Sequence, residues 1–185
     1  MPAHGEPTLR QELRKATHDI HSRLDDAIGN WPIDSAKSYA HFLTLQFRVR
    51  SGVEAALETS PPSPLATPPP QSALIAHDLA ELSTAVPAKI PAFEFSNSSQ
   101  SIGAAWVLAG ASLGNKAILV RRCKAGISGA DRFLADAALP TYFRDMLNYL
   151  DQPRNMQTTA DAISGATMVF AAFEDAIGFT LDVAA

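Results

Sequence analysis

The chain has 185 residues, of which 18% are charged and 46% hydrophobic, and its formal net charge is −4 at pH 7. This length suits one domain with a buried core, and the negative charge excludes the basic surface that nucleic-acid binding requires. The single cysteine, Cys123, excludes an internal disulfide and fits a reducing, cytoplasmic compartment. We therefore expect one cytoplasmic domain over residues 1–185.

No strand and no membrane span are expected. The N-terminal stretch MPAHGEPTLRQELRK lacks the apolar segment of a signal peptide. The longest run of apolar residues and glycines, residues 102–111, is too short to cross a bilayer. No stretch alternates apolar and polar residues with β-branched enrichment over the length of a strand, so the sequence predicts an all-α protein.

The first helix is predicted to begin at a capping box formed by Thr8 and Gln11 and to run to about Ile28, where GNWP stops it. Its apolar residues recur at helical spacing and form one stripe centred near Ile20. The residues of this stripe are Leu9, Leu13, Ala16, Ile20, Leu24 and Ala27.

His21 is expected at the edge of that stripe beside Thr17, whereas His18 is expected on the opposite, solvated face. Arg14 lies two turns before His21 on nearly the same heading. An imidazole can bind a metal and a guanidinium can pair with a carboxylate, so this arrangement suits a flat anionic ligand.

The rest of the chain divides into further helices separated by loops. Residues 60–70, SPPSPLATPPP, contain six prolines in eleven positions and cannot be helical. The stretch AKIPAFEFSNSSQ is expected to be a loop, and Pro140 to end a short helix and begin the next at its first position. The predicted helices cover residues 35–58, 73–85, 101–124, a short stretch before 140, 140–151, and 158 or 159 to 183.

The helix over residues 101–124 carries unusual glycines. Gly110 and Gly114 lie one turn apart, on the same face as Gly103 and Trp106. Each interior glycine costs a helix about 1 kcal/mol relative to alanine, so some feature must require bare backbone there. Two explanations stay open: close packing of another helix, or a wide planar ligand lying against the backbone.

Several enzyme classes lack their motifs. The sequence contains no Glu-x-x-His, no glycine-rich phosphate loop, no Gly-x-Ser-x-Gly and no Cys-x-x-Cys. Cys123 could act as a nucleophile, but it lies among Arg121, Arg122 and Lys124 at a helix end, which favours an unreactive surface thiol.

Four segments together resemble the heme oxygenases, and most closely their bacterial biliverdin-forming branch that is often paired with bacteriophytochromes. The first resembles the helix that carries the heme-ligating histidine, the second the kinked distal helix, and the other two later segments of the family. The resemblance covers the first helix and most of residues 101–180, but not residues 60–100. The segments are LRKATHDIHSRLDDA, VLAGASLGNKAILVRR, ALPTYFRDML and AISGATMVFAAFEDAI.

The resemblance implies an all-α, heme oxygenase-like bundle that holds heme b as both substrate and cofactor. His21 matches the iron ligand and Arg14 a partner of the heme propionates. Gly110 and Gly114 match the distal glycines that lie against the porphyrin. Thr17 and Trp106 are expected to line the same heme site.

The implied reaction opens heme to biliverdin and releases carbon monoxide and iron. Mammalian members have an acid where this chain has Ala111, and many members have a second glycine where it has Asn115. We therefore expect Ser112 or Asn115 to hold a water that supplies the proton. The last helix also lacks the basic residues that often hold the propionates, since no Lys or Arg follows Arg154.

The resemblance also implies partners. Electrons are expected from a ferredoxin or flavoprotein reductase, because no flavin or nicotinamide site is visible. A bacteriophytochrome is expected as an acceptor of biliverdin, and the protein as a monomer. Two alternatives remain: a non-catalytic heme-binding or heme-storage protein with this fold, and a helical hydrolase on the related thiaminase-like bundle that uses Cys123.

Overall fold

The computed structural model describes residues 6–184, apart from 30, 32, 34 and 89, and describes side chains as far as residue 178. Every regular element among these residues is a helix, which confirms the predicted all-α class. The elements are α1 (Leu9–Gly29), α2 (Ala36–Thr59), α3 (Ser72–Glu81), α4 (Ser98–Ala111), the 3₁₀ turn η1 (Ser112–Gly114), α5 (Asn115–Lys124), α6 (Arg132–Ala135), α7 (Ala138–Leu150) and α8 (Met156–Ala184).

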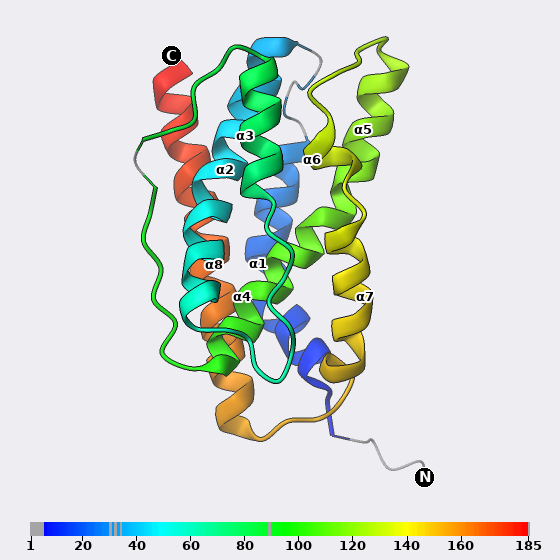
Figure 1. Ribbon diagram of the computed structural model, residues 1–185. Helices are drawn as coiled ribbons and strands as arrows, with labels where there is room; N and C mark the ends of the chain where they lie inside the picture. Colours follow the sequence, from blue (N-terminus) through cyan, green and yellow to red (C-terminus); the bar gives the residue numbers. More distant parts are fainter. Residues whose placement is uncertain (1–5, 30, 32, 34, 89, 185) are drawn as a thin grey trace.

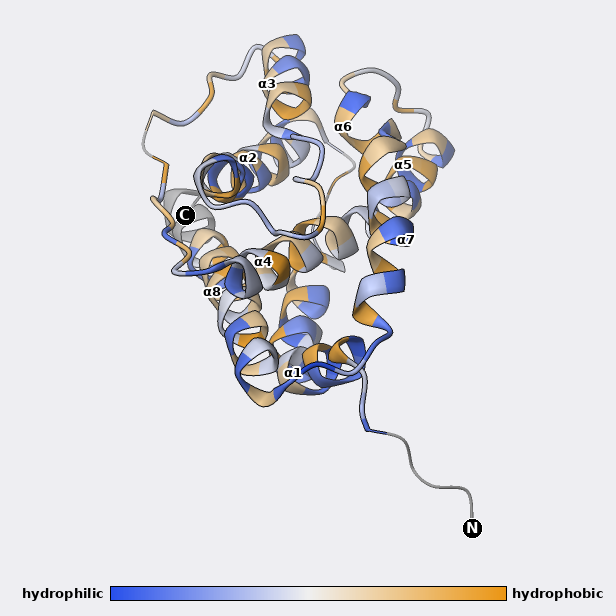
Figure 2. Ribbon diagram, turned by 60° about the horizontal axis from the view of Figure 1, so that its bottom comes forward, coloured by the Kyte–Doolittle hydropathy of each residue, from blue (hydrophilic) through white to orange (hydrophobic). Residues whose placement is uncertain are grey.

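Helix α4 occupies the centre of the bundle (Figure 1). It packs most extensively against α8, which also contacts α1 and α2, and α7 covers another side of it. Helix α6 contacts both α3 and α5 away from this centre. Hydropathy follows this arrangement: in Figure 2 the central helix α4 is largely hydrophobic, whereas the peripheral helix α1 has a hydrophilic outer face.

The first helix begins at the predicted capping box. The N–H of Thr8 donates to Gln11 Oε1 at 2.9 Å, and the N–H of Gln11 donates to Thr8 Oγ1 at 3.3 Å. Ser35 caps α2 in a similar way, since its hydroxyl accepts the N–H of Ser38 at 3.1 Å. These polar residues satisfy backbone donors that a helix start leaves without partners, which is why the starts of both helices were readable from sequence.

Several predicted helix boundaries are wrong, and among them α8 starts at Met156 rather than at 158 or 159. Helix α4 starts at Ser98 rather than 101, because Asn97 Oδ1 accepts the N–H groups of Ser99 and Gln100 at 3.0 Å each. Helix α3 ends at Glu81 rather than near 85, and Ser83 adopts a left-handed conformation with a φ of 53°. Pro140 lies within the first turn of α7, where the missing N–H has no helical acceptor.

The long helix predicted over residues 101–124 is interrupted. Residues Ser112–Gly114 form a 3₁₀ turn between α4 and α5. Counted together, Ser98–Lys124 has the length and apolar composition of a membrane-spanning helix, but 56% of its most apolar window is buried within the protein. A core helix meets the same test, so composition does not by itself place this segment in a membrane.

Two glycines bring α4 and α8 into backbone contact. A Cβ on Gly103 would overlap the carbonyl oxygen of Ala162, and one on Gly165 would overlap the carbonyl oxygen of Gln100.

The apolar stripe predicted for α1 is less completely buried than expected, because two of its residues, Ala16 and Ala27, are exposed. Thr17 is buried instead, so the core-facing side of α1 is rotated away from its predicted centre.

Candidate functional site

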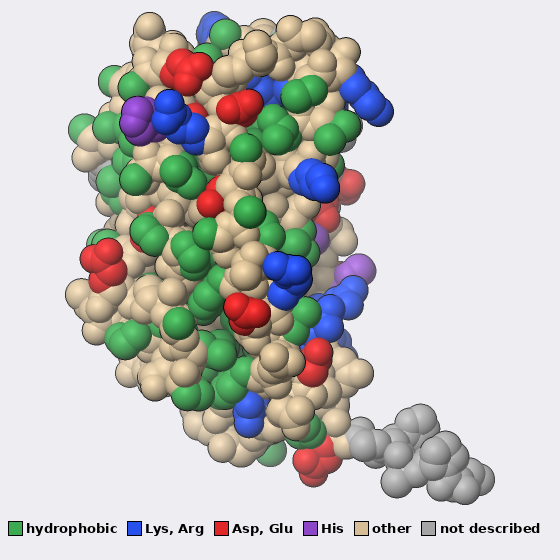
Figure 3. Space-filling view, turned by 45° about the vertical axis from the view of Figure 1, so that its right-hand side comes forward, with side chains coloured by type: hydrophobic (Ala, Val, Ile, Leu, Met, Phe, Trp, Pro, Cys, Tyr) green, Lys and Arg blue, Asp and Glu red, His purple; other side chains and the backbone are tan. Residues whose placement is uncertain are grey.

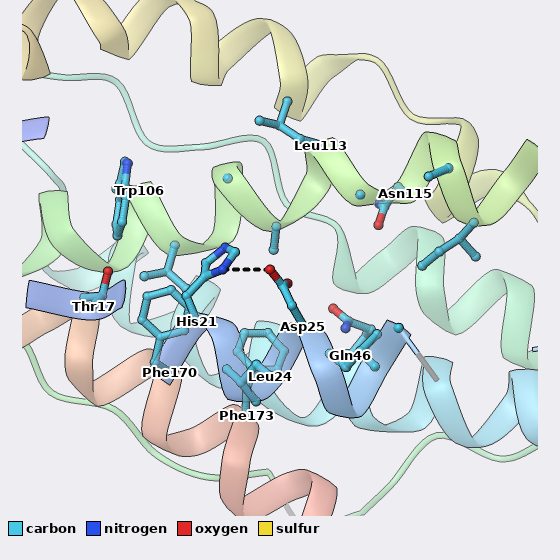
Figure 4. A pocket seen from close by; sticks show the side chains of 18 of the residues that line it. Thr17, His21, Leu24, Asp25, Gln46, Trp106, Leu113, Asn115, Phe170 and Phe173 are labelled. Atoms are coloured by element: carbon cyan, nitrogen blue, oxygen red, sulfur yellow. Dashed lines mark ion pairs between the residues drawn. The ribbon is translucent and has the colours of Figure 1, made fainter. Parts of the chain in front are cut away.

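A pocket with a volume of about 700 Å³ separates α1 from the α4–η1–α5 segment (Figure 4). This volume lies within the range of small-molecule sites, about 300–1,000 Å³. Side chains of α2, α7 and α8 complete its walls. The lining residues are Arg10, Arg14, Thr17, His18, His21, Leu24, Asp25, Ile28, Gly29, Phe42, Gln46, Trp106, Val107, Gly110, Ala111, Leu113, Gly114, Asn115, Ala117, Ile118, Arg121, Phe143, Phe170 and Phe173.

His21 projects from α1 into this pocket (Figure 4). Its Nδ1 lies 2.9 Å from Asp25 Oδ2, and its ring meets the ring of Phe170 edge-on at 5.8 Å between centroids. Because Asp25 engages Nδ1, Nε2 is the nitrogen that remains for a metal, and a carboxylate partner of this kind fixes the orientation of a ligating imidazole. Sequence reasoning missed Asp25, although an acid four residues after a histidine lies on the same helix face.

The wall opposite α1 contains two glycines with open space in front of them. No heavy atom lies within 4 Å of a Cβ built on Gly114, and the nearest to one on Gly110 is a ring carbon of Phe143 at 3.8 Å. Neither glycine is required for helix packing, in contrast to Gly103. The two explanations left open by the sequence therefore apply to different glycines of the same segment.

The kink between α4 and α5 turns Ser112 away from the pocket. Ser112 is 4% exposed and is not among the lining residues, and its hydroxyl donates to the carbonyl of Ala109 at 2.6 Å. Of the two residues expected to hold a water, Ser112 or Asn115, only Asn115 lines the pocket. The physical reason is the 3₁₀ turn, which tightens the backbone and rotates the residues that follow relative to a continuous α-helix.

Asn115 and Gln46 present amide groups at the end of the pocket near α5. Asn115 Nδ2 donates to the carbonyl of Phe133 at 3.3 Å, and Figure 4 shows the Asn115 oxygen pointing into the pocket. Gln46 lines the pocket and its Oε1 accepts from Arg50 Nε at 3.0 Å, which leaves the amide nitrogen of Gln46 as the donor for a further hydrogen bond. No sequence pattern pointed to Gln46, because a single polar residue inside a long helix such as α2 is common.

Three arginines line the pocket, and Arg14 differs from the other two. Arg10 Nη1 lies 3.4 Å from Asp151, while Arg121 donates to the backbone carbonyls of Gly29 and Trp31. Within the described part of the chain Arg14 makes no hydrogen bond or ion pair, so its guanidinium is available to an anion. Figure 3 shows basic side chains and a histidine grouped along one edge of the molecule, although the chain as a whole is acidic.

The remaining predicted residues also reach the pocket. Thr17 is 1% exposed, and its hydroxyl proton is engaged because it donates to the carbonyl of Leu13 at 2.8 Å. The ring of Trp106 packs edge-on against the ring of Phe170, with centroids 6.3 Å apart. His18 lines the pocket too, and the prediction that it faces away is wrong, because residues three apart on a helix differ by only about 60° in heading.

Cys123 is exposed and does not line the pocket. The described residues contain no group of three or more His, Cys, Asp or Glu side chains that could hold a metal ion. The pocket described above therefore gives no support to the hydrolase alternative, since its nucleophile lies outside it.

Neither the models of known protein families nor the curated proteins include a match to this chain. Among solved structures, the chain is similar to the heme oxygenase from Neisseria meningitidis, which was determined with NO and with CO bound. The two share 21% sequence identity with a TM-score of 0.75, and the match covers 94% of this chain and 92% of the other. The helices described above therefore have the fold of a heme oxygenase.

Proposed function

We propose that the protein binds heme b in this pocket and opens it to biliverdin, with release of carbon monoxide and iron. One observation carries the proposal: His21, oriented by Asp25, faces the uncovered backbone of Gly110 and Gly114 across a cavity of about 700 Å³. The likeness in fold to a heme oxygenase supports it.

The residues of the pocket fit a flat, iron-bearing anion. A wide ring needs a wall free of side chains, and Gly110 and Gly114 leave that space. The iron needs a nitrogen donor, which is His21 Nε2, and the ring needs apolar contacts such as Phe170. The propionates need a cation without another partner, and Arg14 is such a residue within the described part of the chain.

Heme, when bound, supplies iron that binds and reduces O₂ and a ring carbon that is oxidised; the protein supplies position and polarity. His21 would hold the iron from the α1 side, and the carboxylate of Asp25 would keep a proton on His21 Nδ1. Trp106 and Thr17 would pack against the ring.

On the α5 side, Asn115 Oδ1 would accept a hydrogen bond from a water, and Gln46 Nε2 would donate one to it. A water held between an acceptor and a donor can deliver a proton in a fixed direction. Solvent would have to return the proton that this water gives up, because neither amide can release one. With solvent as the source no side-chain acid is required at Ala111, where mammalian members have an acid.

The proposal includes the partners that the resemblance implies. A ferredoxin or flavoprotein reductase would supply the electrons, and a bacteriophytochrome would accept biliverdin. The protein would act as a cytoplasmic monomer, as the single cysteine of the chain suggests for the compartment.

Hemin titration followed by reduction in air tests the proposal. We expect a Soret band that saturates at one hemin per chain, and its replacement by the spectrum of biliverdin after reductant is added. A Soret band that persists through repeated reduction would favour the heme-storage alternative. Absence of any saturable Soret band would overturn heme binding altogether.

A further inference from the structure

A buried arginine lies directly behind the pocket. Arg50 of α2 is 0% exposed, and no carboxylate lies within ion-pair distance of it among the described residues. Burial lowers the pKa of its guanidinium to about 10, while the charges of Glu54 and Asp136 partly oppose that shift. Because a buried cation without an ion pair is costly, the contacts of Arg50 require an explanation.

The first contact fixes the direction of an amide in the pocket wall. Arg50 Nε donates to Gln46 Oε1 at 3.0 Å. A guanidinium can only donate hydrogen bonds, so it holds the oxygen of the Gln46 amide and excludes the flipped orientation. The Gln46 NH₂ group makes no hydrogen bond among the described residues, and Gln46 lines the pocket, so this group can donate to an anionic ligand there.

The second contact is at the kink of the opposite wall. The N–H of Ser112 bonds to the carbonyl of Ala109 instead of the carbonyl of Leu108 that a continuous α-helix would use. Arg50 Nη1 donates to this released carbonyl of Leu108 at 3.4 Å. The Arg50 guanidinium also lies 5.1 Å from the centroid of the Phe133 ring, and the carbonyl of Phe133 accepts the amide of Asn115.

We propose that Arg50 is a positioning residue for the pocket: it keeps the α4–η1 kink in place and turns the Gln46 amide so that its N–H groups donate into the cavity. The proposal rests on the proposed function only for the identity of the ligand. The kink and the amide are features of the apoprotein and can be measured without heme.

Hydrogen exchange of the apoprotein tests the kink. The variant is Arg50→Lys, whose single ammonium cannot reach both Gln46 and Leu108 with the geometry of a guanidinium. The control is Arg122→Lys, because Arg122 is also a buried arginine, at 3% exposed, but it packs on Tyr39 and does not line the pocket. We expect backbone amides over residues 108–115 to exchange at least about tenfold faster in Arg50→Lys than in Arg122→Lys. Equal exchange in the two variants would overturn the role of Arg50 in the kink.

Fluoride binding to the ferric heme complex tests the amide, because fluoride accepts hydrogen bonds. Loss of one donated hydrogen bond should weaken fluoride binding by about tenfold in Arg50→Lys and in Gln46→Leu, and should leave Arg122→Lys unchanged. Gln46→Glu is the substitute test if Arg50→Lys does not fold. This variant keeps Arg50, and its carboxylate should turn toward the guanidinium, so that residue 46 has no hydrogen-bond donor for fluoride. Wild-type fluoride affinity in Gln46→Glu, or an equal loss in Arg122→Lys, would contradict the proposal. If the wild-type protein binds no hemin, the proposed function fails, and the exchange experiment still decides the role of Arg50.

Discussion

Two glycine-to-alanine substitutions in one segment should have opposite effects on the apoprotein. Gly114 has helical dihedral angles, a φ of −74° and a ψ of −22°, and no atom lies within 4 Å of the position of a new Cβ. Alanine should therefore bring the gain in helix propensity of about 0.5–1 kcal/mol. For a chain of this size that corresponds to a melting temperature about 1–4 °C higher.

At Gly103 the same methyl group has no space. It would overlap the carbonyl oxygen of Ala162 and lie 2.9 Å from the backbone nitrogen of Ala166, so α4 and α8 would have to separate. Both contacts are with backbone, which cannot rotate away as a side chain can. Overpacking of this kind costs about 1–3 kcal/mol, or about 2–12 °C in melting temperature.

The effects on heme chemistry should be reversed. A methyl group on residue 114 would project into the pocket and cost the bound state about 1–3 kcal/mol, which corresponds to about 5- to 150-fold slower biliverdin formation per folded molecule. Gly103→Ala should keep near wild-type turnover once corrected for its folded fraction, because Gly103 does not line the pocket.

Calorimetric melts of the apoproteins, combined with single-turnover biliverdin formation, measure both effects. Gly110→Ala should resemble Gly114→Ala in apoprotein stability, since its new Cβ would lie 3.8 Å from a ring carbon of Phe143, an ordinary contact distance. A Gly114→Ala apoprotein that melts well below wild type and turns over normally would refute the reasoning. It would mean that Gly114 is required for packing and not for a ligand.

Three further predictions concern other residues. His21→Ala should abolish the histidine-ligated heme spectrum while His18→Ala retains it, and a resonance Raman iron–imidazole mode retained in both variants would rule out His21 as the ligand. Arg14→Ala should weaken hemin binding by about tenfold without changing the coordination state, as titration by Soret absorbance would measure; an unchanged dissociation constant would place the propionates elsewhere. Tyr39 donates to the carbonyl of Ala130 at 2.9 Å, and burial raises its pKa. The unfolded chain therefore loses this proton first, near pH 10, so wild type should lose stability as pH rises above about 10. Urea unfolding should show a flatter alkaline profile for Tyr39→Phe, and an equally steep one would contradict this reasoning.

Local signals in the sequence placed most of the helices, although they missed the 3₁₀ turn at Ser112–Gly114. The capping box at Thr8 and the serine at residue 35 mark helix starts because their side chains satisfy backbone donors a few residues away. The prolines of residues 60–70 exclude a helix for an equally local reason. Such contacts do not depend on the rest of the fold, so they can be read from a short stretch of chain.

Helical periodicity also predicted which face of α1 lines the pocket. It placed His21 near Arg14, and both line the pocket. Periodicity gives a heading on one helix but not the position of the neighbouring helices. The sequence therefore misplaced His18, put the exposed residues Ala16 and Ala27 in the core, and missed the part that Asp25 plays beside His21.

The role of each glycine was decided only by tertiary structure. Gly103, Gly110 and Gly114 share one predicted face, yet the first contacts the backbone of α8 and the other two face open space. The Arg50 network, which joins α2 to the kink after α4, likewise links residues 58 positions apart. The sequence by itself determined the helical class and the approximate helix positions, and it placed His21 and Arg14 on one side of α1, because these features depend on neighbours within a turn or two. Whether a bare stretch of helix packs against protein or faces a pocket depends on how distant helices cross, and that is set by the summed contacts of the whole bundle.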